Sequence, residues 1–179
     1  PHYSPDLDDD EYAEIPEFTR ILGAAKVTGK TPDGWSVGVL ESVTAEEHAK
    51  IRGIESNREQ TVEPVTNYFV SRIQKDFNDG NTYLGGMFTA VNRKINEDHL
   101  DFLHSAAYSG GIDLVHKWKN KTWALDAGWY FSHVKGSREA IKNTQESYLR
   151  TFQRPDADYV NYDTTRTSLT GQGGKFTIG

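Results

Sequence analysis

Apolar and polar side chains alternate along residues 123–134. The side chains that share the apolar face of this predicted strand are Trp123, Leu125, Ala127, Trp129 and Phe131. Because successive side chains of a β-strand point to opposite faces, the pattern predicts one apolar and one polar face. The apolar face spans about 9 residues, which is the length of a tilted strand that crosses a membrane.

The same design recurs along the chain and predicts an all-β protein. Short turn sequences at residues 31–34, 78–81 and 119–121 each separate two alternating segments, and the first two contain Asp-Gly, a strong hairpin signal. We therefore expect an antiparallel up-and-down meander of about seven strands, made of three hairpins and a final strand. The expected strands cover residues 19–29, 35–44, 65–77, 82–93, 104–118, 122–134 and 167–179.

The connections between the hairpins are long, and two of them carry helix signals. Thr44 followed by Glu47 is a capping-box pattern and predicts a short helix through Arg52. In the connection at residues 135–165, Ser137 is a suitable N-cap for a helix that packs on the mouth of the sheet. The apolar and small residues at helical spacing there are Ile141, Thr144, Tyr148, Leu149 and Phe152.

The first residues differ in composition from the rest. Residues 1–18 are rich in Asp, Glu and Pro, which predicts an acidic, extended and exposed arm. Residues 19–179 form the predicted β-barrel segment. The chain starts with Pro1 and lacks a signal sequence, so we expect it to be an excerpt from a longer precursor.

The layout is typical of an outer-membrane-type β-barrel, which has short turns at one end and long loops at the other. Aromatic residues near both strand ends correspond to two interfacial girdles. The residues assigned to the girdles are Trp35, Tyr83, Trp118, Trp123, Trp129 and Phe131. A soluble β-barrel that binds a small ligand shares the hairpins and the aromatic residues, so that class stays open.

Composition narrows the classes of function. No run approaches the roughly 18 apolar residues of a membrane-spanning helix. The net charge of −6 and the scattered basic residues argue against nucleic acid as a partner. The chain has no cysteine, which removes disulfides and thiolate chemistry. No cofactor-binding motif is present.

Polar residues on the second face of the strands are the candidates for a barrel lumen. They are Arg72, Gln74, Asp76, Asp113, Lys117 and Asp126, with Arg20 and Lys26 as further members. Ion pairs and water that fill a lumen are the favoured interpretation. Asp113 and Asp126 lie on adjoining strands and are low-ranking candidates for the paired carboxylates of a glycoside hydrolase.

A zinc site is a weaker hypothesis. His99, Asp101 and His104 lie close in sequence and offer nitrogen and oxygen ligands, but their spacing is generic. We expect exposed histidines and no bound metal.

Several separated segments resemble a known family. They are Glu63–Arg72, Gln74–Asn78, Gly85–Met87, Thr89–Arg93, Gln153–Tyr159 and Thr165–Leu169. They resemble the β-barrel region of uncharacterised Gram-negative envelope proteins, in which a domain similar to carbohydrate-binding module family 9 precedes a long outer-membrane-type barrel. The resemblance covers residues 21–174. It implies a location in the outer membrane, and it implies that this chain lacks the carbohydrate-binding-like domain and later strands.

The most distinctive loop motif contains Arg154, Asp156, Asp158 and, further on, Arg166. We expect Arg154 and Asp156 to pair with Asp163 and Arg166 and so fold the loop inward.

The sequence therefore predicts a fragment of an outer-membrane β-barrel with a structural or transport role in the cell envelope, linked to surface carbohydrate. Its expected partners are membrane lipid, the rest of the precursor, carbohydrate, and a second copy through open sheet edges. A soluble ligand-binding barrel and a glycan-hydrolysing domain are the alternatives.

Overall fold

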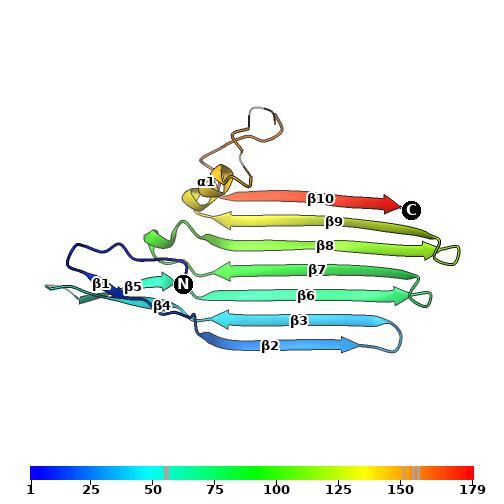
Figure 1. Cartoon of the computed structure of the whole chain (residues 1–179), viewed down its shortest axis with the longest axis horizontal. Helices are drawn as coiled ribbons and strands as arrows, with labels where there is room; N and C mark the ends of the chain where they lie inside the picture. Colours follow the sequence, from blue (N-terminus) through cyan, green and yellow to red (C-terminus); the bar gives the residue numbers. More distant parts are fainter. Residues whose placement is uncertain (55–56, 151, 155, 157) are drawn as a thin grey trace.

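Two antiparallel sheets make up most of the computed structural model, which describes residues 1–179 apart from 55–56, 151, 155 and 157. The larger sheet has seven strands in the order β10-β9-β8-β7-β6-β3-β2 (Figure 1). Its strands are β2 (Ile21–Lys30), β3 (Trp35–Thr44), β6 (Thr66–Phe77), β7 (Thr82–Arg93), β8 (His104–Trp118), β9 (Trp123–Gly136) and β10 (Ser168–Ile178). The predicted all-β meander is confirmed.

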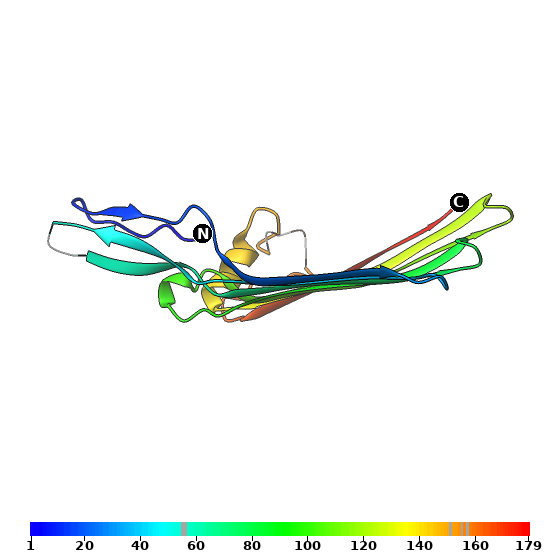
Figure 2. The ribbon, with the colours of Figure 1, turned by 90° about the horizontal axis from the view of Figure 1, so that it is seen from below.

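The sheet is an open layer. In the described part of the chain, β2 and β10 each have a neighbouring strand on one side only. Seen from its edge, the sheet is a single long, curved layer (Figure 2). All ten residues of β2 are exposed, so the sheet is not packed against a second one there.

The tight turns and the long connections lie at opposite ends of the sheet (Figure 1). The turn at Asn78–Gly80 has three consecutive residues with positive φ, a conformation that suits Asn, Asp and Gly. The turn at Lys119–Lys121 also has three consecutive residues with positive φ, although two of them are lysine. In the described part of the chain, the remaining secondary structure lies in the long connections and in the N-terminal arm.

A three-stranded sheet extends β3 and β6 beyond the large sheet, with the order β1-β4-β5 (Figure 1). It contains β1 (Tyr12–Glu14), β4 (Glu47–Arg52) and β5 (Asn57–Glu63). The predicted helix from Thr44 to Arg52 is therefore wrong. Thr44 continues β3 and pairs with Thr66, so it does not cap a helix. Along β4 buried and exposed residues alternate, which is the period of a strand.

The acidic arm is docked onto this small sheet. Its strand β1 pairs with β4, and the Tyr3 main-chain N–H donates to the Val62 carbonyl at 3.2 Å. His2 Nδ1 lies 2.6 Å from Oε2 of Glu63, whose side chain is buried. Composition alone missed these contacts, because they depend on a partner strand rather than on the arm itself.

The buried core lies at the long-connection end, not on a face of the large sheet. The buried apolar side chains there include Ala45, Ala49, Ile51, Val62, Leu100, Leu103, Ala140 and Ile141. They come from the small sheet, from the short helix η1 (Asp98–Leu100) and its neighbours, and from helix α1 (Arg138–Glu146). This core anchors the connections to one end of the sheet.

Helix α1 begins where the sequence predicts. Ser137 is its N-cap, and the Ser137 Oγ accepts a hydrogen bond from the Ala140 N–H at 3.0 Å. The helix ends at Glu146, so Tyr148 and Leu149 lie beyond it and are largely exposed. Among the residues that the structure describes, no helix is long and apolar enough to cross a membrane.

Candidate functional site: a charged network on one face of the sheet

The register of the strands divides the large sheet into a polar and an apolar face. Residues that pair directly across antiparallel strands point to the same side. Gln74 pairs with Gly85, which pairs with Asp113, and Val115 pairs with Asp126. All six predicted lumen residues consequently share one face: Arg72, Gln74, Asp76, Asp113, Lys117 and Asp126. We call this side of the sheet the polar face.

An ion pair between Arg72 and Asp113 is the centre of the polar face. Arg72 Nη1 and Nη2 each donate to one oxygen of Asp113 at 3.0 Å. This two-bond geometry is the strongest form of an arginine–carboxylate contact. Because Arg72 lies on β6 and Asp113 on β8, the pair crosses the strand between them.

Polar contacts extend this pair across the sheet. Gln74 Nε2 donates to Asp76 Oδ1 at 3.1 Å, and Lys30 Nζ lies 3.9 Å from Asp76 Oδ2. At the other edge, Lys175 Nζ of β10 lies 2.6 Å from Asp126 Oδ2 of β9. A pocket of about 250 Å³ lies beside Arg72 and Asp113. Charged groups of both signs therefore occur on the polar face from β2 to β10.

Glycines give these side chains room to lie flat on the sheet. A Cβ atom added to Gly85 would lie 2.8 Å from Asp113 Oδ2 and 2.9 Å from Arg72 Nη2. A Cβ atom on Gly128 would lie 2.4 Å from the Tyr130 hydroxyl oxygen. These distances are shorter than real contacts, so a Cβ atom at either position would force the ends of these side chains to move.

The two carboxylates considered for glycoside hydrolysis are both engaged with cations. Asp113 is held by Arg72 and Asp126 by Lys175. They share the polar face, but Asp113 pairs with Gly128, two residues away from Asp126. The arrangement favours the structural interpretation of both residues.

The opposite side of the sheet, which we call the apolar face, carries large exposed side chains. Trp129 is 46% exposed, Ile112 is 57% exposed and Phe176 is 73% exposed. The Trp118 and Trp123 rings stack with centroids 6.2 Å apart at the short-turn end, and Trp129 and Phe131 lie 5.8 Å apart further along β9. Trp35 also lies on this face, because its partner Lys75 is offset by one residue from the polar Gln74.

Tyr83 differs from the other predicted girdle residues. It pairs with Asp76 and with Val115, which places it on the polar face. The position of Tyr83 next to a short turn predicts a girdle residue on the same face as the tryptophans. The strand register places Tyr83 on the opposite face. Arg20, expected in the lumen, lies before β2 and pairs with Glu47.

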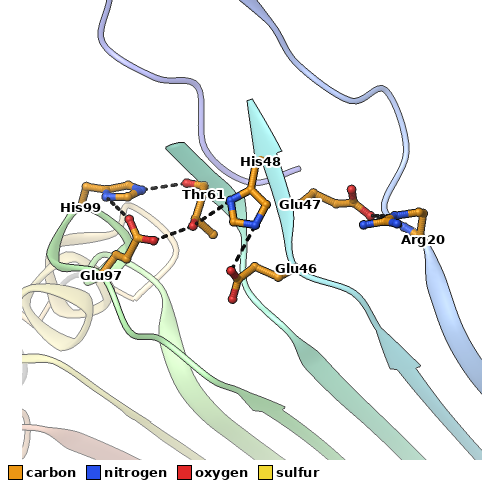
Figure 3. Close-up of polar contacts among 7 residues, drawn as sticks. All are labelled: Arg20, Glu46, Glu47, His48, Thr61, Glu97 and His99. Carbon is orange, nitrogen blue, oxygen red and sulfur yellow. Dashed lines mark hydrogen bonds and ion pairs between the residues drawn. The ribbon is translucent and has the colours of Figure 1, made fainter. Parts of the chain in front are cut away.

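A second polar cluster lies at the long-connection end (Figure 3). Thr61 Oγ1 donates to Glu97 Oε1 at 2.6 Å, and Thr61 Oγ1 lies 3.3 Å from His48 Nδ1. His99 Nε2 lies 2.7 Å from the Thr61 carbonyl oxygen. The cluster joins β4 and β5 to the connection before β8. The alternation of apolar and polar residues along β4 is the sequence signal that would have located this cluster.

The histidines considered for zinc have other partners. His104 Nε2 lies 2.7 Å from Thr144 Oγ1, and His99 Nδ1 lies 3.5 Å from Glu97 Oε2. Within the described ranges, the structure contains no group of three or more His, Asp or Glu side chains placed to hold a metal ion.

Glu47 has a buried side chain at this end and forms an ion pair with the exposed Arg20 (Figure 3). Its Oε1 accepts from the Arg20 main-chain N–H at 2.9 Å and from Arg20 Nε at 3.0 Å. The Arg20 main-chain N–H and then its guanidinium hold the pKa of Glu47 below its ordinary value of 4.5.

Among the described residues of the loop motif, the ion pairs are local. Arg154 Nη2 lies 2.7 Å from Asp156 Oδ2, and Arg166 Nε lies 3.6 Å from Asp163 Oδ2. The expected pairing between the two groups is wrong, because each arginine is satisfied by a carboxylate two or three residues away. Asp158 is exposed, while residues 155 and 157 of this motif lie outside the described residues.

Comparisons with known proteins give a family but no characterised relative. No curated protein and no solved structure is detectably similar to the chain. Residues 1–162 match the family described as Domain of unknown function (DUF5916). This match covers most of the 179 residues, so the chain belongs to the DUF5916 family.

Proposed function

We propose that this chain is a section of an outer-membrane β-barrel, with lipid on its apolar face and an aqueous lumen on its polar face. Its role is structural or in transport across the cell envelope. The observation that carries the proposal is the separation of the two faces of the same seven strands. A soluble sandwich or barrel would cover its apolar face with its own side chains.

Strand length supports a membrane location. The strands of the large sheet run from 10 residues in β2 to 15 in β8. A tilted membrane-spanning strand needs about 9 to 11 residues, so every strand is long enough. The short turns and long connections lie at opposite ends, which is the arrangement of such barrels.

The charges on the polar face suit a wet lumen. Arg72, Asp113, Lys175 and Asp126 are paired and partly accessible to solvent. Exposed ions of both signs are costly against lipid but are hydrated in a water-filled lumen. A lumen of this kind favours passage or binding of polar solutes. The resemblance to envelope proteins with a carbohydrate-binding-like domain makes surface carbohydrate the solute class that we propose.

Membrane partition tests the proposal. The purified protein is mixed with phosphatidylcholine liposomes, and the bound fraction is measured after flotation in a density gradient. We expect the protein to float with the liposomes and to aggregate in buffer without detergent. A protein that stays monodisperse in plain buffer and does not float contradicts the proposal.

A matched pair of variants tests whether the apolar face, and not the polar face, contacts lipid. Ile112→Lys puts a charge on the apolar face, at a cost of about 2 to 4 kcal/mol near the middle of a bilayer. Val115→Lys puts the same charge on the polar face, opposite Asp126. We expect Ile112→Lys to reduce flotation and Val115→Lys to leave it unchanged.

A further inference from the structure

Three lysines surround a pocket at the short-turn end of the sheet. The pocket has a volume of about 460 Å³ and is lined by Asn81, Lys117, Trp118, Lys119, Asn120 and Lys121. The Lys117 main-chain N–H donates to the Asn81 carbonyl at 2.7 Å, which joins the second and third turns. The pocket therefore has a fixed backbone wall and a strong positive charge.

The three lysines differ from their neighbours in having no carboxylate partner. At the same end, Lys30 pairs with Asp76, Lys75 with Asp33 and Lys175 with Asp126. Within the described part of the chain, Lys117, Lys119 and Lys121 form no salt bridge. Their charge is available to an anion from outside the chain.

The backbone of the third turn is poorly matched to lysine. Lys119, Asn120 and Lys121 have φ angles of 48°, 54° and 66°. In the second turn, Asn78, Asp79 and Gly80 have φ angles of 52°, 52° and 79°. Asn, Asp and Gly adopt this conformation readily and lysine does not. Since the same turn is built elsewhere in the chain from favourable residues, turn geometry does not explain the two lysines.

Tryptophan rings lie immediately beside the lysines. Trp118 lines the pocket and stacks on Trp123 on the apolar face. If lipid covers that face, the two rings lie where tryptophan is enriched, at the level of the lipid headgroups. Lys119 and Lys121 then lie just beyond the rings, within reach of the headgroup phosphates.

We infer that this pocket binds the phosphate of an anionic glycerophospholipid headgroup in the membrane leaflet nearest the short turns. The inference rests on the proposed membrane location. Lys119 and Lys121 contact the phosphate as point charges, Lys117 adds to the field of the pocket, and the Trp118–Trp123 stack contacts the glycerol and upper acyl chains. Binding at this site fixes how deeply this end of the barrel lies in the membrane.

A turn replacement tests the inference without damaging the fold. The variant K119N/K121G gives the third turn residues of the kind found in the second turn. The control variant K94N/K135N removes two lysines from the opposite end of the sheet. Native mass spectrometry in neutral detergent then measures retention of added phosphatidylglycerol, with diacylglycerol and inorganic phosphate as comparison ligands.

The wild type and K94N/K135N should retain phosphatidylglycerol, and K119N/K121G should bind it about tenfold more weakly. The thermal midpoint of K119N/K121G should equal or exceed that of the wild type, because strained lysines are removed. Equal retention by all three proteins overturns the inference. Equal binding of inorganic phosphate or diacylglycerol overturns the assignment to a lipid phosphate. Flotation with liposomes without selective retention overturns this site alone, whereas failure to float overturns the proposed function.

Discussion

Arg72 and Asp113 form a two-bond ion pair across an intervening strand, with both nitrogen–oxygen distances at 3.0 Å. Strand β7 lies between them and contributes Gly85 beneath the pair. One contact therefore fixes three strands relative to one another on the polar face.

Breaking this pair should weaken the sheet. Arg72→Gln and Asp113→Asn each remove the charge-assisted bonds, and the Arg72 side chain is 42% exposed, so solvent screens part of the attraction. In a double-mutant cycle, the free energy of unfolding in urea and detergent should show a coupling of about 1 kcal/mol. Additive effects of the two substitutions would mean that the pair makes no net contribution.

Gly85→Ala should disturb the same pair from the strand beneath it. The new Cβ would approach Asp113 Oδ2 at 2.8 Å, so the pair has to move. We expect a loss of about 1 kcal/mol in the free energy of unfolding. Gly173→Ala is the control on the same face, because a Cβ there meets nothing within 4 Å. Equal stability of the two variants would contradict the close contact.

The small sheet should loosen in acid. The pKa of Glu47 is lowered in the folded protein, so its ionised form stabilises the fold above the ordinary value of 4.5. That contribution is lost as the pH falls below 4.5 and through the lowered folded value. The protection factors of the β4 amides, which are exchange rates corrected for the intrinsic effect of pH, should fall from pH 6 to pH 3 in the wild type. In Glu47→Gln the protection factors should be lower at pH 6 and depend less on pH, and identical profiles of protection against pH would count against the Arg20 contact.

Helix α1 depends on its cap. Ser137→Ala removes the acceptor for the Ala140 N–H and should destabilise the helix by about 1 kcal/mol. Ser137 Oγ also donates to the Asp101 carbonyl, so Ser137→Thr, which keeps the hydroxyl, is the control. Faster hydrogen exchange in α1 for Ser137→Ala alone is the expected result, and the same exchange in both variants would contradict it.

Alternation was sufficient to predict the large sheet because side-chain direction in a strand has a period of two residues. This alternation also placed six polar residues, from Arg72 to Asp126, on one face of the sheet, where the strand register puts them. Tyr83 shows the limit of this reasoning: its distance from a turn suggested a girdle, but its register with Asp76 decides its face.

Contacts distant in sequence were not accessible from local patterns. Thr44 and Glu47 match a helix cap locally, yet Thr44 pairs with Thr66 and Glu47 binds Arg20. The docking of the arm through His2 and Glu63, 61 residues apart, has no local signal either.

The most direct measurement of the central claim compares two neighbouring residues of β8. Leu114 lies on the apolar face and Val115 on the polar face, at the same depth in the sheet. The chain has no cysteine, so Leu114→Cys and Val115→Cys each accept a single fluorescent label. In liposomes, the account predicts quenching of the label at 114 by a quencher on the lipid chains, and quenching of the label at 115 by a water-soluble quencher. Equal access of both labels to the water-soluble quencher, or the reverse pattern, would contradict a sheet with lipid on one face and water on the other.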